Sequence, residues 1–170
     1  CMKKHILTIT LLLFFITLSI SAAKVDTVVT YSPAMKKAIK ALVVTPDTYN
    51  DSKSFPVFYL LHGYSGNYTS WVKDMPATLA LADQHQFIVV CPDGGFSSWY
   101  FDSPTDSTFR YETYVTDELI RWIDRKYKTI AKREGRAISG LSMGGHGGLY
   151  LGFRHQDVYG ACGSMSGGVD

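Results

Sequence analysis

The sequence predicts an α/β fold, in which an open and mostly parallel sheet carries helices on both of its faces. Two observations predict this fold class. Residues 55–61 and 86–91 are nearly continuous apolar runs, which suit strands that are buried on both faces. Segments with strand character also alternate with segments of helical periodicity, and this alternation is typical of a sheet built from strand–helix units.

The other expected elements follow from local patterns along the chain. Residues 25–31 and 39–45 are predicted to form a leading pair of strands, because a proline-containing turn follows each of them. Residues 113–127 are predicted to form a helix, since apolar side chains recur at helical spacing opposite a charged face. The remaining expected elements are a helix over 70–83 despite Pro76, a strand over 136–139, a glycine-rich helix over 145–153 and a buried strand over 158–166.

Residues 1–23 have the pattern of a secretory signal peptide. Lys3 and Lys4 begin it, an apolar stretch runs from residue 6 to residue 20, and Ser21-Ala22-Ala23 supplies small residues at a cleavage point. A membrane anchor is the alternative, but the apolar stretch has about 15 residues where a spanning helix needs about 20. We therefore expect a secreted or periplasmic protein whose mature chain begins at about Lys24.

The composition limits the kinds of partner that the protein can have. Residues 24–170 suffice for one domain with a sizeable core, and they contain no internal repeat. Lys and Arg total 17 against 15 for Asp and Glu, so a dedicated nucleic-acid-binding protein is not expected. The sequence has no HExxH motif, no paired cysteine–histidine spacing and no P-loop, so we expect neither a metal nor another cofactor.

The motif Gly140-Leu141-Ser142-Met143-Gly144 stands between the predicted strand over 136–139 and the glycine-rich helix. A serine on such a turn has a strained backbone that raises its hydroxyl above the sheet, and only small residues fit two positions before and after it. Ser142 is therefore predicted to be a nucleophile that forms an acyl-serine intermediate. The N–H of Met143 is one candidate donor of an oxyanion hole. The alternative is a glycine-rich turn without chemistry.

Three sequence blocks occur together in the order 59–67 (YLLHGYSGN), 90–95 (VCPDGG) and 137–145 (AISGLSMGG). With them the chain resembles, from about Val25 to Asp170, the α/β-hydrolase esterases of the esterase D, feruloyl esterase and tributyrin esterase type. The resemblance implies the α/β-hydrolase fold and a serine esterase that acts on small acyl or carbohydrate-linked esters, of acetyl or feruloyl type, without a cofactor. It also places the second oxyanion donor at the backbone N–H of Tyr64. Related mycolyltransferases share the acyl-enzyme step, so acyl transfer is an alternative outcome.

The histidines of the chain do not supply an obvious base for Ser142. His62 belongs to the first of the three blocks and is expected to orient its loop. His146 lies one helical turn beyond Ser142, where its side chain is expected to point along the helix. His85 and His155 lie near the ends of predicted elements.

The acid is equally hard to place. In α/β hydrolases the acid and then the histidine follow the nucleophile along the chain. Asp157 precedes a predicted strand and so lies at the wrong edge of the sheet, whereas Asp170 follows that strand at the right edge. Since no full triad results, we expect an N-terminal part of an esterase domain, inactive by itself, whose acid and base lie beyond Asp170 in later strands. The alternative is a secreted binding module that lost its base.

An aromatic segment, Phe96-Ser97-Ser98-Trp99-Tyr100-Phe101, follows the predicted strand over 86–91. At the carboxyl edge of the sheet it is positioned to wall the acyl or sugar side of a pocket. Trp99 and Tyr100 are therefore candidate substrate contacts. The alternative is that these aromatic side chains only cover the sheet.

Cys91 and Cys162 are expected to be free, buried thiols. If the strand order of the family holds, the strand of Cys91 is outermost of four, followed by those of Val57, Ile138 and Cys162. Three strand spacings of about 4.8 Å separate the two cysteines by roughly 14 Å. A disulfide needs Cα atoms within about 7 Å, so this order excludes a bridge.

Overall fold

The computed structural model describes residues 22–168, which form one six-stranded sheet in the order β1-β2-β4-β3-β5-β6. Strands β4, β3, β5 and β6 are parallel to one another, while β1 and β2 pair in antiparallel fashion at one edge. The order of the four parallel strands confirms the sequence prediction. The strands are β1 (Lys24–Ser32), β2 (Lys37–Thr45), β3 (Val57–Leu61), β4 (Ile88–Pro92), β5 (Arg136–Gly140) and β6 (Ala161–Cys162).

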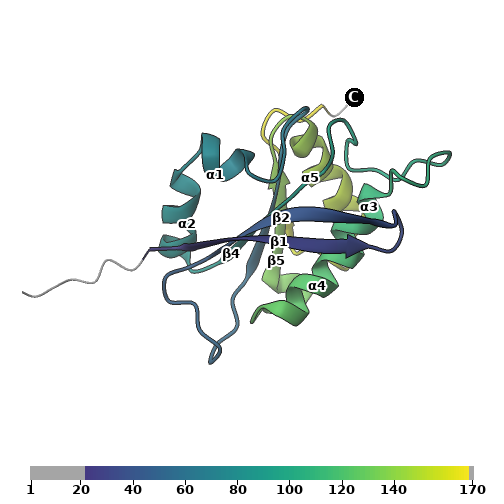
Figure 1. Ribbon diagram of the computed structural model, residues 1–170. Coiled ribbons are helices and arrows are strands. Elements are labelled where there is room, and N and C mark those ends of the chain that lie inside the picture. The colour runs from purple at the N-terminus through teal and green to yellow at the C-terminus, as the bar shows by residue number, and fades with distance from the viewer. Residues whose placement is uncertain (1–21, 169–170) are drawn as a thin grey trace, which may run out of the picture.

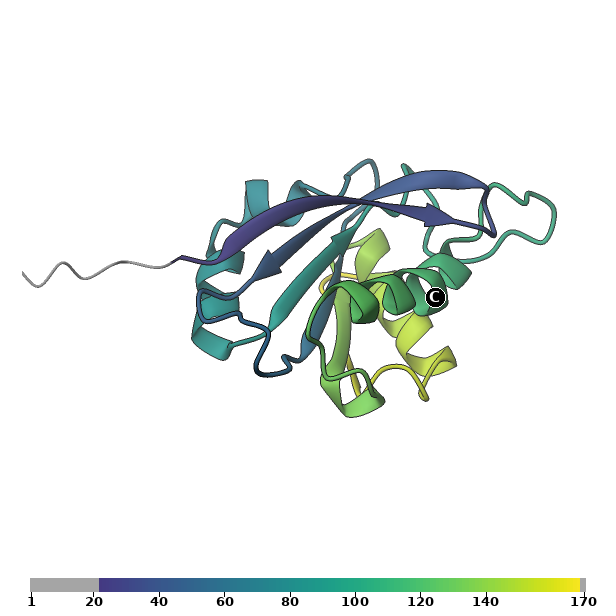
Figure 2. The ribbon, with the colours of Figure 1, turned by 60° about the horizontal axis from the view of Figure 1, so that its bottom comes forward.

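Helices cover both faces of this sheet. Figures 1 and 2 show α1 and α2 on one side, with α3, α4 and α5 on the other. The predicted fold class, an α/β-hydrolase-type sheet with helices on both faces, is thereby confirmed. The helical segments are α1 (Ser70–Asp74), α2 (Ala77–His85), α3 (Tyr111–Thr113), the π-helical turn η1 (Tyr114–Glu118), α4 (Leu119–Lys126), the 3₁₀ turn η2 (Arg133–Gly135) and α5 (Met143–Arg154).

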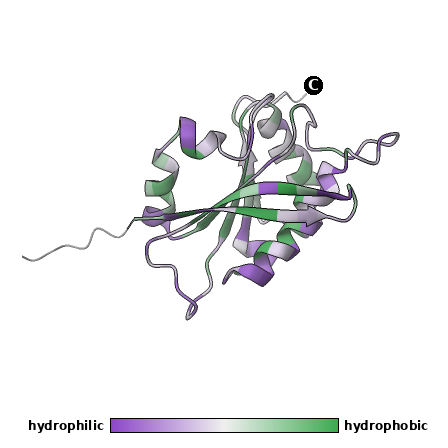
Figure 3. Cartoon of the chain, viewed as in Figure 1, coloured by the Kyte–Doolittle hydropathy of each residue, from purple (hydrophilic) through white to green (hydrophobic). Residues whose placement is uncertain are grey.

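Two hydrophobic clusters, one on each face, hold the layers together. Successive side chains of a strand point to opposite faces, so Val43 of β2 joins the cluster under α4 and α5 while Val44 joins the cluster under α1 and α2. Strand β3 divides in the same way, with Tyr59 in the first cluster and Leu60 in the second. The apolar colour along the inner strands in Figure 3 follows from this two-sided burial.

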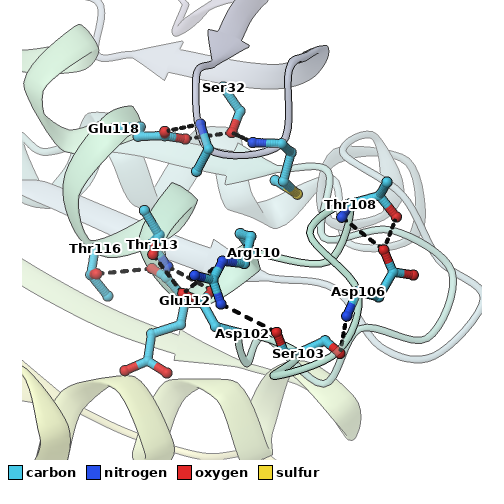
Figure 4. Close-up of polar contacts among 12 residues, drawn as sticks. Ser32, Asp102, Ser103, Asp106, Thr108, Arg110, Glu112, Thr113, Thr116 and Glu118 are labelled. Atoms are coloured by element: carbon cyan, nitrogen blue, oxygen red, sulfur yellow. Dashed lines mark hydrogen bonds and ion pairs between the residues drawn. The ribbon is translucent and has the colours of Figure 1, made fainter.

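Two helix predictions need correction. The single helix expected over 70–83 is two helices, because Pro76 lacks an N–H and disfavours helical geometry at Met75, whose φ and ψ are −133° and 76°. The helix expected over 113–127 begins earlier, at Tyr111, and contains the π turn. There Glu118 accepts hydrogen bonds from the Ser32 hydroxyl (2.5 Å) and the Ala34 N–H (2.8 Å), which fastens the β1–β2 hairpin to this helix (Figure 4).

The last predicted strand is much shorter than expected. Residues 158–166 are predicted to form a buried strand. In the structure only Ala161 and Cys162 form a strand, β6, and both residues are exposed. Strand β6 pairs on one side only, with β5, because it is the edge of the described sheet. Cys91 and Cys162 are both free, as predicted, but only Cys91 is buried, and burial raises the pKa of its thiol to about 12.

The predicted signal peptide lies outside the described residues except for its last two positions. Ala23 is buried in the cluster under α2, and its N–H donates a hydrogen bond of 3.0 Å to the carboxylate of Asp83. Within residues 22–168, no helix is both long enough and apolar enough to cross a membrane.

A carboxylate fastens the first turn of α3 to the last turn of α5. Glu112 accepts hydrogen bonds from the Tyr150 hydroxyl (2.9 Å), the Arg154 Nε (3.0 Å) and the His155 Nε2 (2.8 Å). Burial by itself would raise the pKa of Glu112, but these hydrogen bonds and the Arg154 charge outweigh it and hold the pKa below its ordinary value. Beside it, Asp102 accepts two hydrogen bonds from Thr113, which anchors the loop before α3 (Figure 4).

Glu112→Gln is expected to lower the free energy of unfolding at pH 7 by about 1.5 to 3 kcal/mol, the range for hydrogen bonds to a charged group. A carboxyl whose pKa is lowered by folding stabilises the fold above its unfolded pKa, about 4.3, and that contribution disappears as the pH falls through the folded pKa. Urea denaturation should therefore show a gap between wild type and variant at pH 7 that closes below about pH 4. Glu134→Gln, which replaces an exposed carboxylate, is the matched control. An equal loss of unfolding free energy in both variants would contradict the stabilising role of the Glu112 hydrogen bonds.

Candidate active site

Ser142 occupies a tight turn between β5 and α5, at the carboxyl edge of the sheet, and this turn, residues 140–144, is called the elbow. Its backbone has a φ of 56° and a ψ of −116°, a region that costs a non-glycine residue roughly 1–3 kcal/mol. Hydrogen bonds hold the turn: the Leu141 N–H donates to Leu61 O (3.2 Å), the Ser142 N–H to Met165 O (2.8 Å) and the His146 N–H to Ser142 O (2.9 Å). The predicted strand–turn–helix geometry is therefore present, with Ser142 on the exposed side.

Two glycines allow this turn to lie against β3. A Cβ at Gly140 would come within 2.5 Å of both Leu61 O and the Gly144 carbonyl, and a Cβ at Gly144 would overlap Leu61 O. These neighbours are backbone atoms, which cannot turn away as a flexible side chain can. Only glycine fits at either position, which is a stricter limit than the small residues that the sequence motif predicted.

The two predicted oxyanion donors, Met143 and Tyr64, belong to segments that meet at the elbow. The Met143 N–H begins α5, whose twelve residues direct a positive helix end at the turn. Tyr64 lies in the loop after β3, and this loop touches the elbow, since a Cβ on Gly63 would lie 3.6 Å from the Ser142 Cβ. Neither N–H donates a hydrogen bond to the backbone of residues 22–168. The N–H groups of both predicted donors are therefore without a backbone acceptor, on segments that contact each other at Ser142.

His62 lies next to the elbow but is fully engaged. The ring is buried, with Nδ1 2.8 Å from Gly63 O and Nε2 2.8 Å from the Gly94 N–H. Burial lowers the pKa of His62, against the opposing influence of the Gly63 hydrogen bond and of Asp93. Asp93 Oδ1 lies 4.0 Å from Nε2, but Nε2 must accept from Gly94, so the imidazole is neutral and this contact is not an ion pair.

The other described histidines have partners of their own. His146 Nδ1 lies 2.9 Å from Gly168 O, and its ring stacks on Tyr150. His155 contacts Glu112, and His85 stacks on Phe87. None of the histidines within residues 22–168 is hydrogen-bonded to the Ser142 hydroxyl. Asp157 lies before β6, at the amino edge of the sheet, and Asp170 lies outside the described residues.

Aromatic side chains border the elbow. Tyr64 and Phe96 are exposed and meet edge to face, with ring centroids 4.9 Å apart. Trp99, 37% exposed, packs edge to face on His146 with centroids 5.5 Å apart. Of the predicted substrate contacts, Trp99 therefore lies on the accessible rim.

The prediction that Tyr100 contacts the substrate is wrong, because its side chain is fully buried and cannot reach a substrate from this position. Its hydroxyl donates a 3.1 Å hydrogen bond to His62 O, and its ring fills the space over Gly94 and Gly147. Tyr100 has a φ of 61°, which is rare for an aromatic residue. The sequence prediction missed this role because nothing in the pattern of residues 96–101 separates a buried tyrosine from an exposed one.

One cavity of the described residues lies away from the elbow. It has a volume of about 460 Å³ and opens at the amino ends of β3 and β5, lined among others by Pro56, Phe87 and Gly160. Its lining contains no serine, threonine, cysteine, lysine or histidine side chain. Within residues 22–168 there is also no cluster of histidine, cysteine or carboxylate side chains that could hold a metal ion. The elbow is therefore the candidate active site on chemical grounds.

Comparison with known proteins identifies the family. The Esterase family profile matches residues 32–170, which include the elbow and the His62 loop. The chain belongs to the Esterase family. An esterase of Mycobacterium tuberculosis is 33% identical over 129 residues, a match that covers 74% of this chain and 28% of that protein. An endo-1,4-β-xylanase/feruloyl esterase of Xylanibacter ruminicola is 37% identical over 122 residues, covering 68% and 17%.

Two further similarities bear on chemistry and fold. The diacylglycerol acyltransferase/mycolyltransferase Ag85A of Mycobacterium tuberculosis is 31% identical over 148 residues, covering 82% of this chain and 41% of that protein. A solved ferulic acid esterase superposes with a TM-score of 0.70 at 32% identity, covering 81% of this chain and 57% of that one. This chain thus spans about half or less of the length of the curated relatives that it matches.

Proposed function

We propose that this member of the Esterase family is a carboxylic ester hydrolase that acts through an acyl-serine intermediate on Ser142. The observation that carries the proposal is the elbow, which holds Ser142 at a positive φ on the exposed carboxyl edge of the sheet, directly before α5. Esterase relatives over most of the chain support it.

The geometry suits acyl transfer to the serine. The Ser142 hydroxyl attacks the ester carbonyl while a base removes its proton, and the carbonyl oxygen becomes an oxyanion. The N–H groups of Met143 and Tyr64 stabilise that oxyanion, and loss of one such donor typically costs about 2.7–4 kcal/mol. The intermediate collapses, the alcohol leaves with the proton, and water then hydrolyses the acyl-serine by the same steps.

We propose that the acid and base of this reaction lie beyond Asp170. The described histidines are engaged elsewhere, and the matches cover only 49% of an acetyl esterase and smaller shares of the other curated relatives. The catalytic experiments below therefore use the protein extended through the residues encoded after Asp170. We also propose that the protein is exported, on the basis of the signal-peptide pattern.

For the substrate, we propose small acyl or carbohydrate-linked esters of acetyl or feruloyl type. The exposed rim of Tyr64, Phe96 and Trp99 offers apolar and aromatic contacts to an acyl group or a sugar ring. Relatives named feruloyl esterase and acetyl esterase support this class. Acyl transfer to an alcohol is the second candidate, favoured by the similarity to the mycolyltransferase.

Product analysis by liquid chromatography separates these candidates. The extended protein is incubated with p-nitrophenyl acetate or methyl ferulate, with and without glycerol as an acyl acceptor. Hydrolysis predicts free acid as the main product in both conditions. Glyceryl ester as the main product would replace hydrolysis by transfer, and no turnover of either ester would contradict the proposed function.

A further inference from the structure

The candidate oxyanion donor Tyr64 shares a peptide unit with Gly63. The same planar group carries the Gly63 carbonyl at one side and the Tyr64 N–H at the other, so the direction of the carbonyl fixes the direction of the N–H. Two donors hold that carbonyl: His62 Nδ1 at 2.8 Å and the Gly66 N–H at 3.1 Å. The side chain of His62 therefore acts on the peptide whose N–H is the proposed oxyanion donor.

The surrounding contacts leave His62 one tautomer and one orientation. Because Nε2 accepts from the Gly94 N–H, the hydrogen of the neutral ring is on Nδ1, where it donates to Gly63 O. The Tyr100 hydroxyl donates to the carbonyl of His62 itself (3.1 Å), and the Tyr100 ring packs against the imidazole at 5.9 Å between centroids. The loops after β3 and β4 are thus joined through one buried ring.

We propose that His62 is a positioning residue for the oxyanion hole, in which its Nδ1–H aims and polarises the Gly63–Tyr64 peptide so that the Tyr64 N–H faces the oxyanion. Donation of a hydrogen bond to a peptide carbonyl strengthens the N–H of the same group as a donor. The Nε2 contact with Gly94 has a different task, which is to hold the ring in place. This inference rests on the proposed esterase function.

Two substitutions separate the tasks of the two ring nitrogens. In His62→Asn, the side-chain amide can occupy the Nδ1 position and donate to Gly63 O, but Gly94 loses its acceptor. In His62→Gln, the longer side chain can keep an acceptor at the Nε2 position, but Gly63 O loses its side-chain donor and keeps only the Gly66 N–H. His85→Gln, a substitution of an exposed histidine on α2, is the control for the general effect of losing an imidazole.

With p-nitrophenyl acetate and the extended protein, His62→Gln is expected to lower kcat at least tenfold with KM within about twofold, because oxyanion donors act on the transition state. His62→Asn should retain most of kcat. A trifluoromethyl ketone that forms a tetrahedral adduct with Ser142 should lose affinity for His62→Gln by the same factor as kcat/KM. Equal loss of kcat in both variants, or a loss confined to KM, would overturn the proposal while leaving the esterase function intact.

A second measurement does not depend on whether the variants fold. A long-range ¹H–¹⁵N spectrum of the wild-type protein at pH 7 should show His62 with Nδ1 protonated and Nε2 unprotonated. The opposite tautomer would overturn the proposal. A wild-type extended protein without esterase activity would overturn the proposed function and, with it, the role of His62.

Discussion

Ser142→Ala is expected to abolish ester hydrolysis by the extended protein while leaving its fold intact. Without the hydroxyl no acyl-serine can form, and loss of a serine nucleophile typically lowers kcat by about a million-fold. Alanine should keep the turn, because the hydrogen bonds that hold the elbow are made by backbone atoms. The measurement is the steady-state rate with p-nitrophenyl acetate, together with circular dichroism.

Ser166→Ala is the matched control for this substitution. Ser166 is also exposed and also has a positive φ, 52°, so its replacement tests the loss of a serine hydroxyl in a strained turn nearby. We expect its rate to equal that of the wild type. An unchanged rate in Ser142→Ala would contradict the assignment of the nucleophile.

The second large effect is expected from Gly144→Ala. The added methyl group would overlap the Leu61 carbonyl and come within 2.7 Å of His62 O, so α5 must move away from β3. Overpacking of this kind costs typically 1–3 kcal/mol and occasionally more, and we expect about 3 kcal/mol because the obstructing atoms are backbone. Urea denaturation measures the loss, and the shifted elbow should also lower kcat.

Gly168→Ala is the control for this glycine. A Cβ there would have its nearest neighbour, Trp99, at 3.8 Å, which is an ordinary contact. Its free energy of unfolding should lie within about 0.5 kcal/mol of the wild type, as for most surface substitutions. If Gly144→Ala were as stable as Gly168→Ala, the close approach of α5 to the sheet would be wrong.

The parts of the fold that the sequence predicted are those with a strong local signal. Continuous apolar runs predicted β3 and β4, because a strand buried on both faces needs apolar side chains at every position. The glycine spacing around Ser142 predicted the elbow, since backbone atoms of β3 lie where a Cβ would be. The role of Tyr64 as an oxyanion donor was implied by the family resemblance alone. In the structure, the loop that contains Tyr64 contacts Ser142.

The errors occurred where the outcome depended on partners distant in the chain. The sequence of residues 158–166 suits a strand, but only Ala161 and Cys162 pair continuously with β5, and Met165 forms an isolated bridge with Leu141 at the elbow. Likewise the bonds of His62 join residues 62 and 94, and those of Glu112 join residues 112 and 155. No periodicity or motif records such pairings, so the tautomer of His62 and the burial of Tyr100 emerged only from the structure.

The central claim, that Ser142 carries the acyl group, is tested most directly by covalent trapping. The extended protein is treated with a fluorophosphonate ester, which reacts with activated serine nucleophiles, and its peptides are mapped by mass spectrometry. The account predicts a single phosphonyl group on the peptide that contains Ser142, with loss of esterase activity in proportion to labelling. Modification of another residue, or full loss of activity with Ser142 unmodified, would contradict it.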